Sequence, residues 1–175
     1  MSKTIIIGLI LFFSPFAVMS QETKIQLTDN VSVVFPEKPA IRNMQDIGVQ
    51  YTLKLADSTA NFYVMATNLE KTSGMKVDVL EAAQQEPAFW QHLEQSFVAQ
   101  VSSDAWVLSS EVKQINGKQV LHLIISGTRN GKKLEITVYI FIDGVYTVNI
   151  VHQKRSEDAS ADLKNKYFGS LNIEK

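Results

Sequence analysis

The sequence predicts an α+β fold in which an antiparallel β-sheet, with a C-terminal four-stranded meander, is flanked by helices. Two Asn-Gly pairs and one Asp-Gly pair separate four apolar runs, near residues 105–115, 118–128, 132–142 and 145–153. These residue pairs favour two-residue hairpin turns, so consecutive runs pair as antiparallel strands. Before the meander, apolar residues recur at helical spacing, which indicates a helix packed on the sheet.

The N-terminal segment has the layout of a secretory signal. A short basic start precedes an apolar run over residues 5–13, and small or neutral residues stand before Gln21. The run is shorter than the roughly 20 residues of a transmembrane helix. We therefore predict a signal peptide, residues 1–20, cleaved near Ser20-Gln21, with no stable membrane anchor; an uncleaved anchor is the alternative. The remaining residues 21–175 are expected to form a single domain in the periplasm or outside the cell.

Composition excludes several classes of chemistry. The chain has no cysteine, which removes disulfides, thiolate nucleophiles and a lipid-modified N-terminus. The formal net charge is −1, and the basic residues are scattered, which argues against a nucleic-acid partner. The two basic doublets are Lys132-Lys133 and Lys154-Arg155. We interpret them as solvated ends of turns; the alternative is an anion-binding patch.

The mature chain is expected to begin with two short strands, residues 24–28 and 31–35, joined by an Asp-Asn turn. Pro36 and Pro39 lack the N–H that a β-ladder requires, so the second strand must end there or lie on an edge. Two longer strands with alternating side chains follow and predict a hairpin, over residues 48–56 and 59–68. Residues 68–76 are predicted to be a mobile loop.

Two helical segments are expected in the middle of the chain, near residues 78–85 and 87–101. Pro87 suits the first turn of a new helix because its missing N–H is not needed there. The second segment carries an apolar stripe at four-residue spacing, formed by Phe89, Leu93 and Phe97. We interpret the stripe as core packing against the sheet; a cofactor or partner groove is the alternative.

A last helix is predicted after the meander, with Ser156 as its N-cap and Gly169 as its end. Its apolar stripe contains Ala159, Leu163 and Tyr167. The final residues, 170–175, are expected to form a terminal strand or a tail.

The stretches "FPEKP", "FW", "FIDGVYTVNI" and "KYFGSLNI", in that order along residues 24 to 173, resemble the PsbP-like family. That fold is shared by the photosystem protein PsbP, a Ran-binding nuclear import factor and exported bacterial proteins of the DcrB type. The resemblance implies an α-β-α sandwich whose antiparallel sheet has helices on both faces. It also implies a binding or assembly role without shared catalytic residues, and it transfers no functional residue to this chain.

The sequence contains no motif for nucleotide, calcium or zinc-protease chemistry, and we predict no cofactor. The histidines are His92, His122 and His152. If the second and fourth meander strands met, His122 and His152 would share a metal site with Glu111 or Glu135 as further ligands. The alternative is that each histidine is structural, with its polar atoms satisfied by neighbours.

Two functions follow from these observations. The preferred one is an exported, non-enzymatic binding or assembly module for a protein partner or a small-molecule ligand. Aromatic side chains concentrate interface energy, so its possible contacts are Tyr51, Tyr63, Tyr139, Phe141, His122 and His152; burial beneath helices is the alternative for the aromatic ones. The second function is a small periplasmic hydrolase or metal-dependent enzyme that uses His122 or His152.

Overall fold

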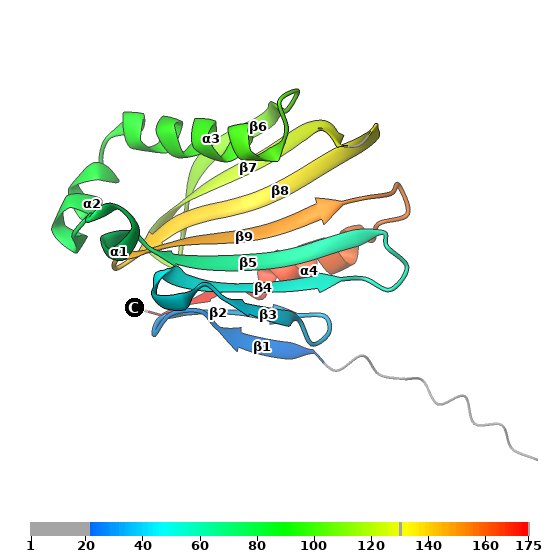
Figure 1. Cartoon of the computed structure of the whole chain (residues 1–175), viewed down its shortest axis with the longest axis horizontal. Helices are drawn as coiled ribbons and strands as arrows, with labels where there is room; N and C mark the ends of the chain where they lie inside the picture. The colour runs from blue at the N-terminus through cyan, green and yellow to red at the C-terminus, as the bar shows by residue number, and fades with distance from the viewer. Residues whose placement is uncertain (1–21, 130, 175) are drawn as a thin grey trace, which may run out of the picture.

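The computed structural model describes residues 22–129 and 131–174, which form two antiparallel sheets and four α-helices (Figure 1). The predicted signal peptide, residues 1–20, lies outside the described residues. Within the described ranges, no helix combines the length and the apolar character needed to cross a bilayer.

The larger sheet has seven strands in the order β3-β4-β5-β9-β8-β7-β6. Their bounds are Ala40–Asn43 (β3), Gly48–Lys54 (β4), Ala60–Asn68 (β5), Trp106–Ile115 (β6), Lys118–Arg129 (β7), Lys132–Asp143 (β8) and Tyr146–Lys154 (β9). Strands β6 to β9 form the predicted meander, and β4 pairs with β5 as the predicted hairpin. Strand β9 then pairs with β5, so the hairpin and the meander join into one sheet.

The smaller sheet has three strands in the order β1-β2-β10, with bounds Thr23–Gln26, Val31–Phe35 and Asn172–Ile173. Strand β2 ends at Phe35, as the two following prolines require. After Pro39 the chain enters β3, an exposed edge strand of the larger sheet that the sequence pattern did not predict. The segment between the prolines therefore carries the chain from one sheet to the other.

The helices are α1 (Leu69–Ser73), α2 (Val77–Ala83), α3 (Pro87–Val101) and α4 (Ala161–Gly169), with a short 3-10 helix η1 (Gln45–Ile47). Helix α3 packs on one face of the larger sheet, where its aromatic stripe joins a core cluster with Leu123, Ile125 and Val138. On the opposite face, α4 and the smaller sheet cover a second cluster (Figure 1). The predicted fold with helices on both faces is confirmed, with a second sheet added beside α4.

The segment predicted as a mobile loop, residues 68–76, instead contains α1. Its first turn is capped by the Asn68 side chain, which accepts a hydrogen bond of 2.9 Å from the Lys71 backbone N–H. Gly74 ends it in the left-handed region at φ 71°. Both caps lie close in sequence, and they stabilise a helix too short to show an apolar period.

The N-cap predicted for the last helix was also wrong. Helix α4 begins after Ser160, whose side-chain oxygen accepts a hydrogen bond of 3.2 Å from the Leu163 N–H. Ser156 lies before the helix, where its side-chain oxygen accepts a hydrogen bond of 3.2 Å from the Asp158 N–H. The backbone N–H groups of Arg155 and Ser156 donate to the carbonyl of Thr59 at 2.8 and 3.2 Å. The chain is therefore still tied to the residue that precedes β5 at this point.

The third meander turn differs from the predicted one by a residue. Asp143 is the last residue of β8 and pairs with Tyr146, so the loop consists of Gly144 and its successor. The Asp143 carboxylate is 4% exposed, 2.7 Å from the Lys118 amine and 2.5 Å from the Thr28 hydroxyl. Burial alone would raise the pKa of Asp143, but its hydrogen bonds with Lys118 and Thr28 outweigh burial and hold the pKa below its usual value. The contact with Thr28 also ties the two sheets together.

Candidate functional site

Part of one face of the larger sheet remains at the surface, beyond the area that α4 and the smaller sheet cover. Strand register places its side chains on one side of β6, β7 and β8: Glu111 is paired with His122, and His122 with Tyr139. We call this surface the open face; it consists of Trp106, Glu111, Lys113, His122, Ile124 and Tyr139.

The polar members of the open face contact one another. Nδ1 of His122 lies 3.0 Å from Oε1 of Glu111, and the Lys113 amine donates a hydrogen bond of 2.9 Å to the Tyr139 hydroxyl. The same amine is 3.9 Å from Glu111 and 4.4 Å from the centroid of the Tyr139 ring. The His122 and Tyr139 rings meet edge to face at 5.0 Å. These mutual contacts hold the side chains in place before any partner binds.

The open face carries both charge signs at close range. The hydrogen bond with His122, together with the charges of His122 and Lys113, holds the pKa of the Glu111 carboxyl below its usual value. Glu111 therefore stays ionised and can accept hydrogen bonds, while Lys113 can donate them. The Glu111 side chain is 57% exposed, so the pair is accessible to a partner from solvent.

The two histidines proposed as a metal pair do not meet. Strand β8 lies between β7 with His122 and β9 with His152, which separates the two backbones by about 9.6 Å, twice the strand spacing. His152 is 3% exposed, and its Nε2 atom has no hydrogen-bond partner. Across residues 22–129 and 131–174, no group of three or more His, Asp or Glu side chains is arranged to hold a metal ion.

The four predicted aromatic contacts have different environments. Phe141 is fully buried, and Tyr51 and Tyr63 pack at the margins of the two core clusters. Of the two interpretations weighed for these residues, partner contact or burial, burial therefore applies to Phe141. Tyr139 alone of the four belongs to the open face, although its ring also packs on Phe168 at 4.5 Å.

Trp106 is an aromatic member of the open face that was not predicted as a contact from the sequence. It is 52% exposed and lies at the start of the edge strand β6. An exposed tryptophan on an edge strand indicates a contact surface, but its exposure cannot be read from the alternation of apolar and polar residues in the sequence.

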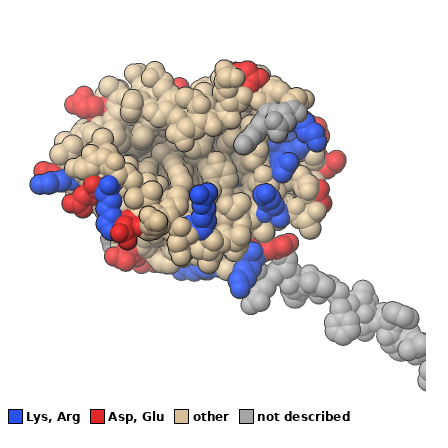
Figure 2. Space-filling view, viewed as in Figure 1, with Lys and Arg blue, Asp and Glu red and all other residues tan. Residues whose placement is uncertain are grey.

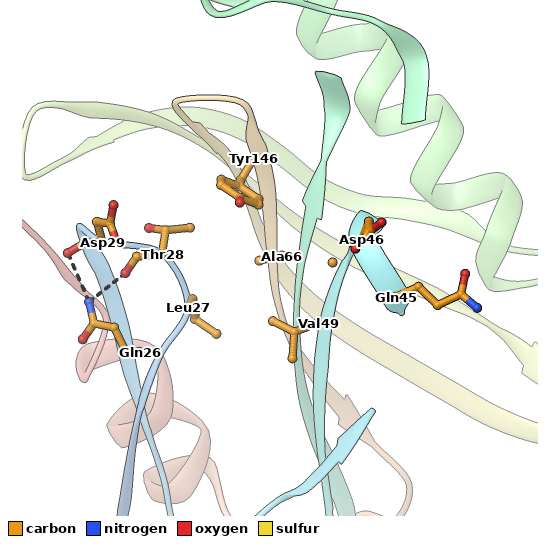
Figure 3. Close-up of a pocket in the computed structure, with 10 residues that line it drawn as sticks. Gln26, Leu27, Thr28, Asp29, Gln45, Asp46, Val49, Ala66 and Tyr146 are labelled. Carbon is orange, nitrogen blue, oxygen red and sulfur yellow. Dashed lines mark hydrogen bonds between the residues drawn. The ribbon is translucent and has the colours of Figure 1, made fainter. Parts of the chain in front are cut away.

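A separate concave site lies between the two sheets at one end of the molecule (Figure 3). Leu27 of the β1–β2 turn and Val49 of β4 face each other across it, with Tyr146 above and Asp29 and Asp46 at its rim. Its volume is about 430 Å³, within the range of small-molecule sites. We call it the inter-sheet pocket.

The inter-sheet pocket depends on a close approach of two backbones at Gly48. A Cβ at this position would lie 2.2 Å from the carbonyl oxygen of Ala66. Gly48→Ala is expected to lower the free energy of unfolding by about 1–3 kcal/mol, because β4 or β5 must shift. Urea denaturation measures this loss. Gly169→Ala, where the added Cβ meets nothing within 4 Å, is the control; an equal loss in both variants would contradict the steric explanation.

No protein-family model and no curated protein sequence matches the chain. Among solved structures, the solution structure of cyanobacterial PsbP (CyanoP) from Synechocystis sp. PCC 6803 is similar, with a TM-score of 0.53 at 11% identity. The similarity covers 91% of this chain and 95% of that one. This chain has the PsbP fold. The family resemblance of the sequence is thus confirmed at the level of fold.

A crystal structure of a protein from Bacteroides thetaiotaomicron VPI-5482 is also similar to this chain, with a TM-score of 0.52 at 12% identity. The similarity covers 90% of this chain and 49% of that one, so this chain spans about half the length of the Bacteroides protein. At such low identities the likeness concerns the fold, and function must be argued from the sites of this chain.

Proposed function

We propose that this chain is an exported, non-enzymatic binding module that docks a protein partner on the open face. The observation that carries the proposal is the combination of Trp106, Tyr139 and a fixed Glu111–Lys113–His122 cluster on one accessible sheet surface. Tryptophan and tyrosine supply much of the binding energy of protein interfaces, and neighbouring charges of both signs supply specificity.

The position of the open face also suits a protein partner. Strand β6 is an edge of the larger sheet, so its outer backbone groups can pair with an extended segment of another chain. Leu108 of the same strand, the bulged residue, is 55% exposed and adds apolar surface along this edge. A partner could thus meet side chains and backbone together.

Export follows from the leader-like residues 1–20, and the proposed location is the periplasm or the outside of the cell. The enzyme alternative retains only His122, because His152 is buried under the α4 layer. The Glu111–His122 pair lies on an open sheet surface, where water screens charges, and this arrangement suits docking better than acid-base catalysis.

Site-specific photo-crosslinking tests the docking surface. A benzophenone amino acid replaces Trp106 in one variant and Ile41 in the other, and both proteins are expressed in a host that exports them. Ile41 is the matched control, since it is 60% exposed on β3, the opposite edge of the same sheet. We expect one discrete adduct from position 106 and none from position 41, identified by mass spectrometry.

A charge reversal sharpens this experiment. Lys113→Glu is expected to lower the adduct yield from position 106 about tenfold, since it places two carboxylates side by side and breaks the contact with Tyr139. Equal adducts from positions 106 and 41, or no adduct from position 106, would refute docking on the open face.

A further inference from the structure

The two basic doublets of the sequence meet at one end of the larger sheet. Lys132 and Lys133 begin β8, Lys154 ends β9, and Arg155 follows it. They line a cavity of about 570 Å³ together with Lys54, the last residue of β4. We call this cavity the basic pocket. Figure 2 shows Lys and Arg side chains at this end of the molecule, with acidic side chains beside them.

Most of these positive charges form no ion pair with the residues that the structure describes. Lys154 is paired with Glu157 at 2.6 Å, and Glu157 is 82% exposed. Glu135 also acts on Lys154, and Lys133 acts on Glu157. Among the residues that the structure describes, no ion pair joins Lys54, Lys132, Lys133 or Arg155 to a carboxylate. The basic pocket therefore keeps an excess of positive charge, drawn from three strands and the segment after β9.

A buried amide in the wall of the basic pocket is incompletely bonded. Asn61 of β5 is 9% exposed, and its Nδ2 group donates a hydrogen bond of 2.9 Å to Oε1 of Gln153. Its Oδ1 atom is buried without a partner. Rotating both amides by 180° keeps their hydrogen bond and turns an Asn61 N–H toward the position of that oxygen. The wall of the basic pocket thus contains a neutral amide pair beside the cations.

We propose that the basic pocket binds a ligand that carries two or more phosphate groups. The cations stand on several walls, so a single small anion would reach only some of them, whereas a diphosphate spans more. Lysine binds phosphate as a point charge, and arginine binds it as a two-pronged donor. This site is distinct from the open face, since it lies at the ends of β4, β8 and β9.

The same chemistry has two sources, a free diphosphate or a lipid headgroup with two phosphates. Isothermal titration with inorganic pyrophosphate tests the first. Cosedimentation with cardiolipin vesicles, compared with phosphatidylcholine vesicles, tests the second. Both use protein purified from a host that exports it.

Lys132→Gln/Lys133→Gln is the test variant, and Lys71→Gln/Lys76→Gln is its matched control, because all four lysines are exposed. We expect the test variant to lose about a hundredfold in affinity, about tenfold for each charged contact, and the control to bind as the wild type does. Lys54→Gln is expected to bind with about tenfold lower affinity, because a lysine from another wall of the basic pocket also contacts the ligand.

The outcomes are distinct. Selective loss of pyrophosphate binding supports a free diphosphate, and selective loss of cardiolipin binding supports a lipid headgroup. Absence of both kinds of binding, or an equal loss in the control variant, overturns the proposal. None of these outcomes bears on the open face, so a failure of the phosphate-binding proposal can be told apart from a failure of the docking proposal.

Discussion

Tyr167→Ala is expected to lower the free energy of unfolding by about 3–5 kcal/mol. Tyr167 of α4 is 1% exposed and meets Phe35 of β2 edge to face at 5.2 Å and Phe62 of β5 at 5.0 Å. Its hydroxyl donates a hydrogen bond of 3.0 Å to the carbonyl of Tyr63. One side chain thus connects the last helix with both sheets, and its removal leaves a cavity where three elements meet.

Urea denaturation separates the ring of Tyr167 from its hydroxyl. Tyr167→Phe keeps the ring contacts and is expected to lower the free energy of unfolding by about 1 kcal/mol, because the carbonyl of Tyr63 loses the hydrogen bond from this hydroxyl. Trp106→Ala is the control, a large aromatic truncation at a 52% exposed site, where a loss below about 1 kcal/mol is expected. If Tyr167→Ala cost no more than Trp106→Ala, the central role of Tyr167 would be wrong.

The meander could be predicted because its turns are local. Asn116 and Gly117 adopt φ values of 50° and 83°, as a hairpin turn of this type requires. Once that turn is placed between Ile115 and Lys118, the register follows, and Glu111 falls opposite His122. The sequence prediction named Glu111 only as one alternative ligand of a metal site with both histidines, although this turn alone pairs Glu111 with His122.

Trp106 could not be placed in the same way. The β6–β7 register shifts between Val107 and Ser109, so β6 gains a residue at Leu108. Without this bulge, Trp106 would point to the α3 side of the sheet; with it, Trp106 is paired with Ser126 and lies on the side of His122. A bulge without a glycine or proline has no sequence signature, and it decides which face carries the tryptophan.

Long-range contacts explain the other differences. The prolines after β2 predict where the strand ends, but the destination of the chain depends on pairing between β3 and β4. Tyr139 and Phe141 alternate identically in the sequence, yet only Phe141 is fully buried, because the covering layer ends between them. The basic doublets likewise meet only because β4, β5, β9 and β8 are neighbours in the sheet.

His152 is expected to make the protein less stable as the pH falls from about 7 to about 5, by about 2 kcal/mol. Burial, with the nearby charges of Lys164 and Lys154, lowers the pKa of His152 from 6.5 to about 4. Between these two values the unfolded chain binds a proton that the folded chain does not, so protonation favours unfolding. Above 6.5 both states are neutral at this residue, and below about 4 both are protonated, so the loss is confined to this window.

His152→Leu is expected to remove this dependence of stability on pH, because leucine cannot titrate. Leucine also keeps an apolar contact with Phe62, whose ring centroid lies 5.1 Å from that of His152 in the wild type. Urea denaturation at a series of pH values measures the slope directly. His92→Leu is the matched control because His92 is exposed on α3, and it should keep the slope of the wild type. The window lies above the acidic range in which Asp143, with its lowered pKa, is protonated, so the two effects separate along the pH axis. A slope that survives in His152→Leu would show that another group carries the proton, and that His152 is not held neutral by its burial.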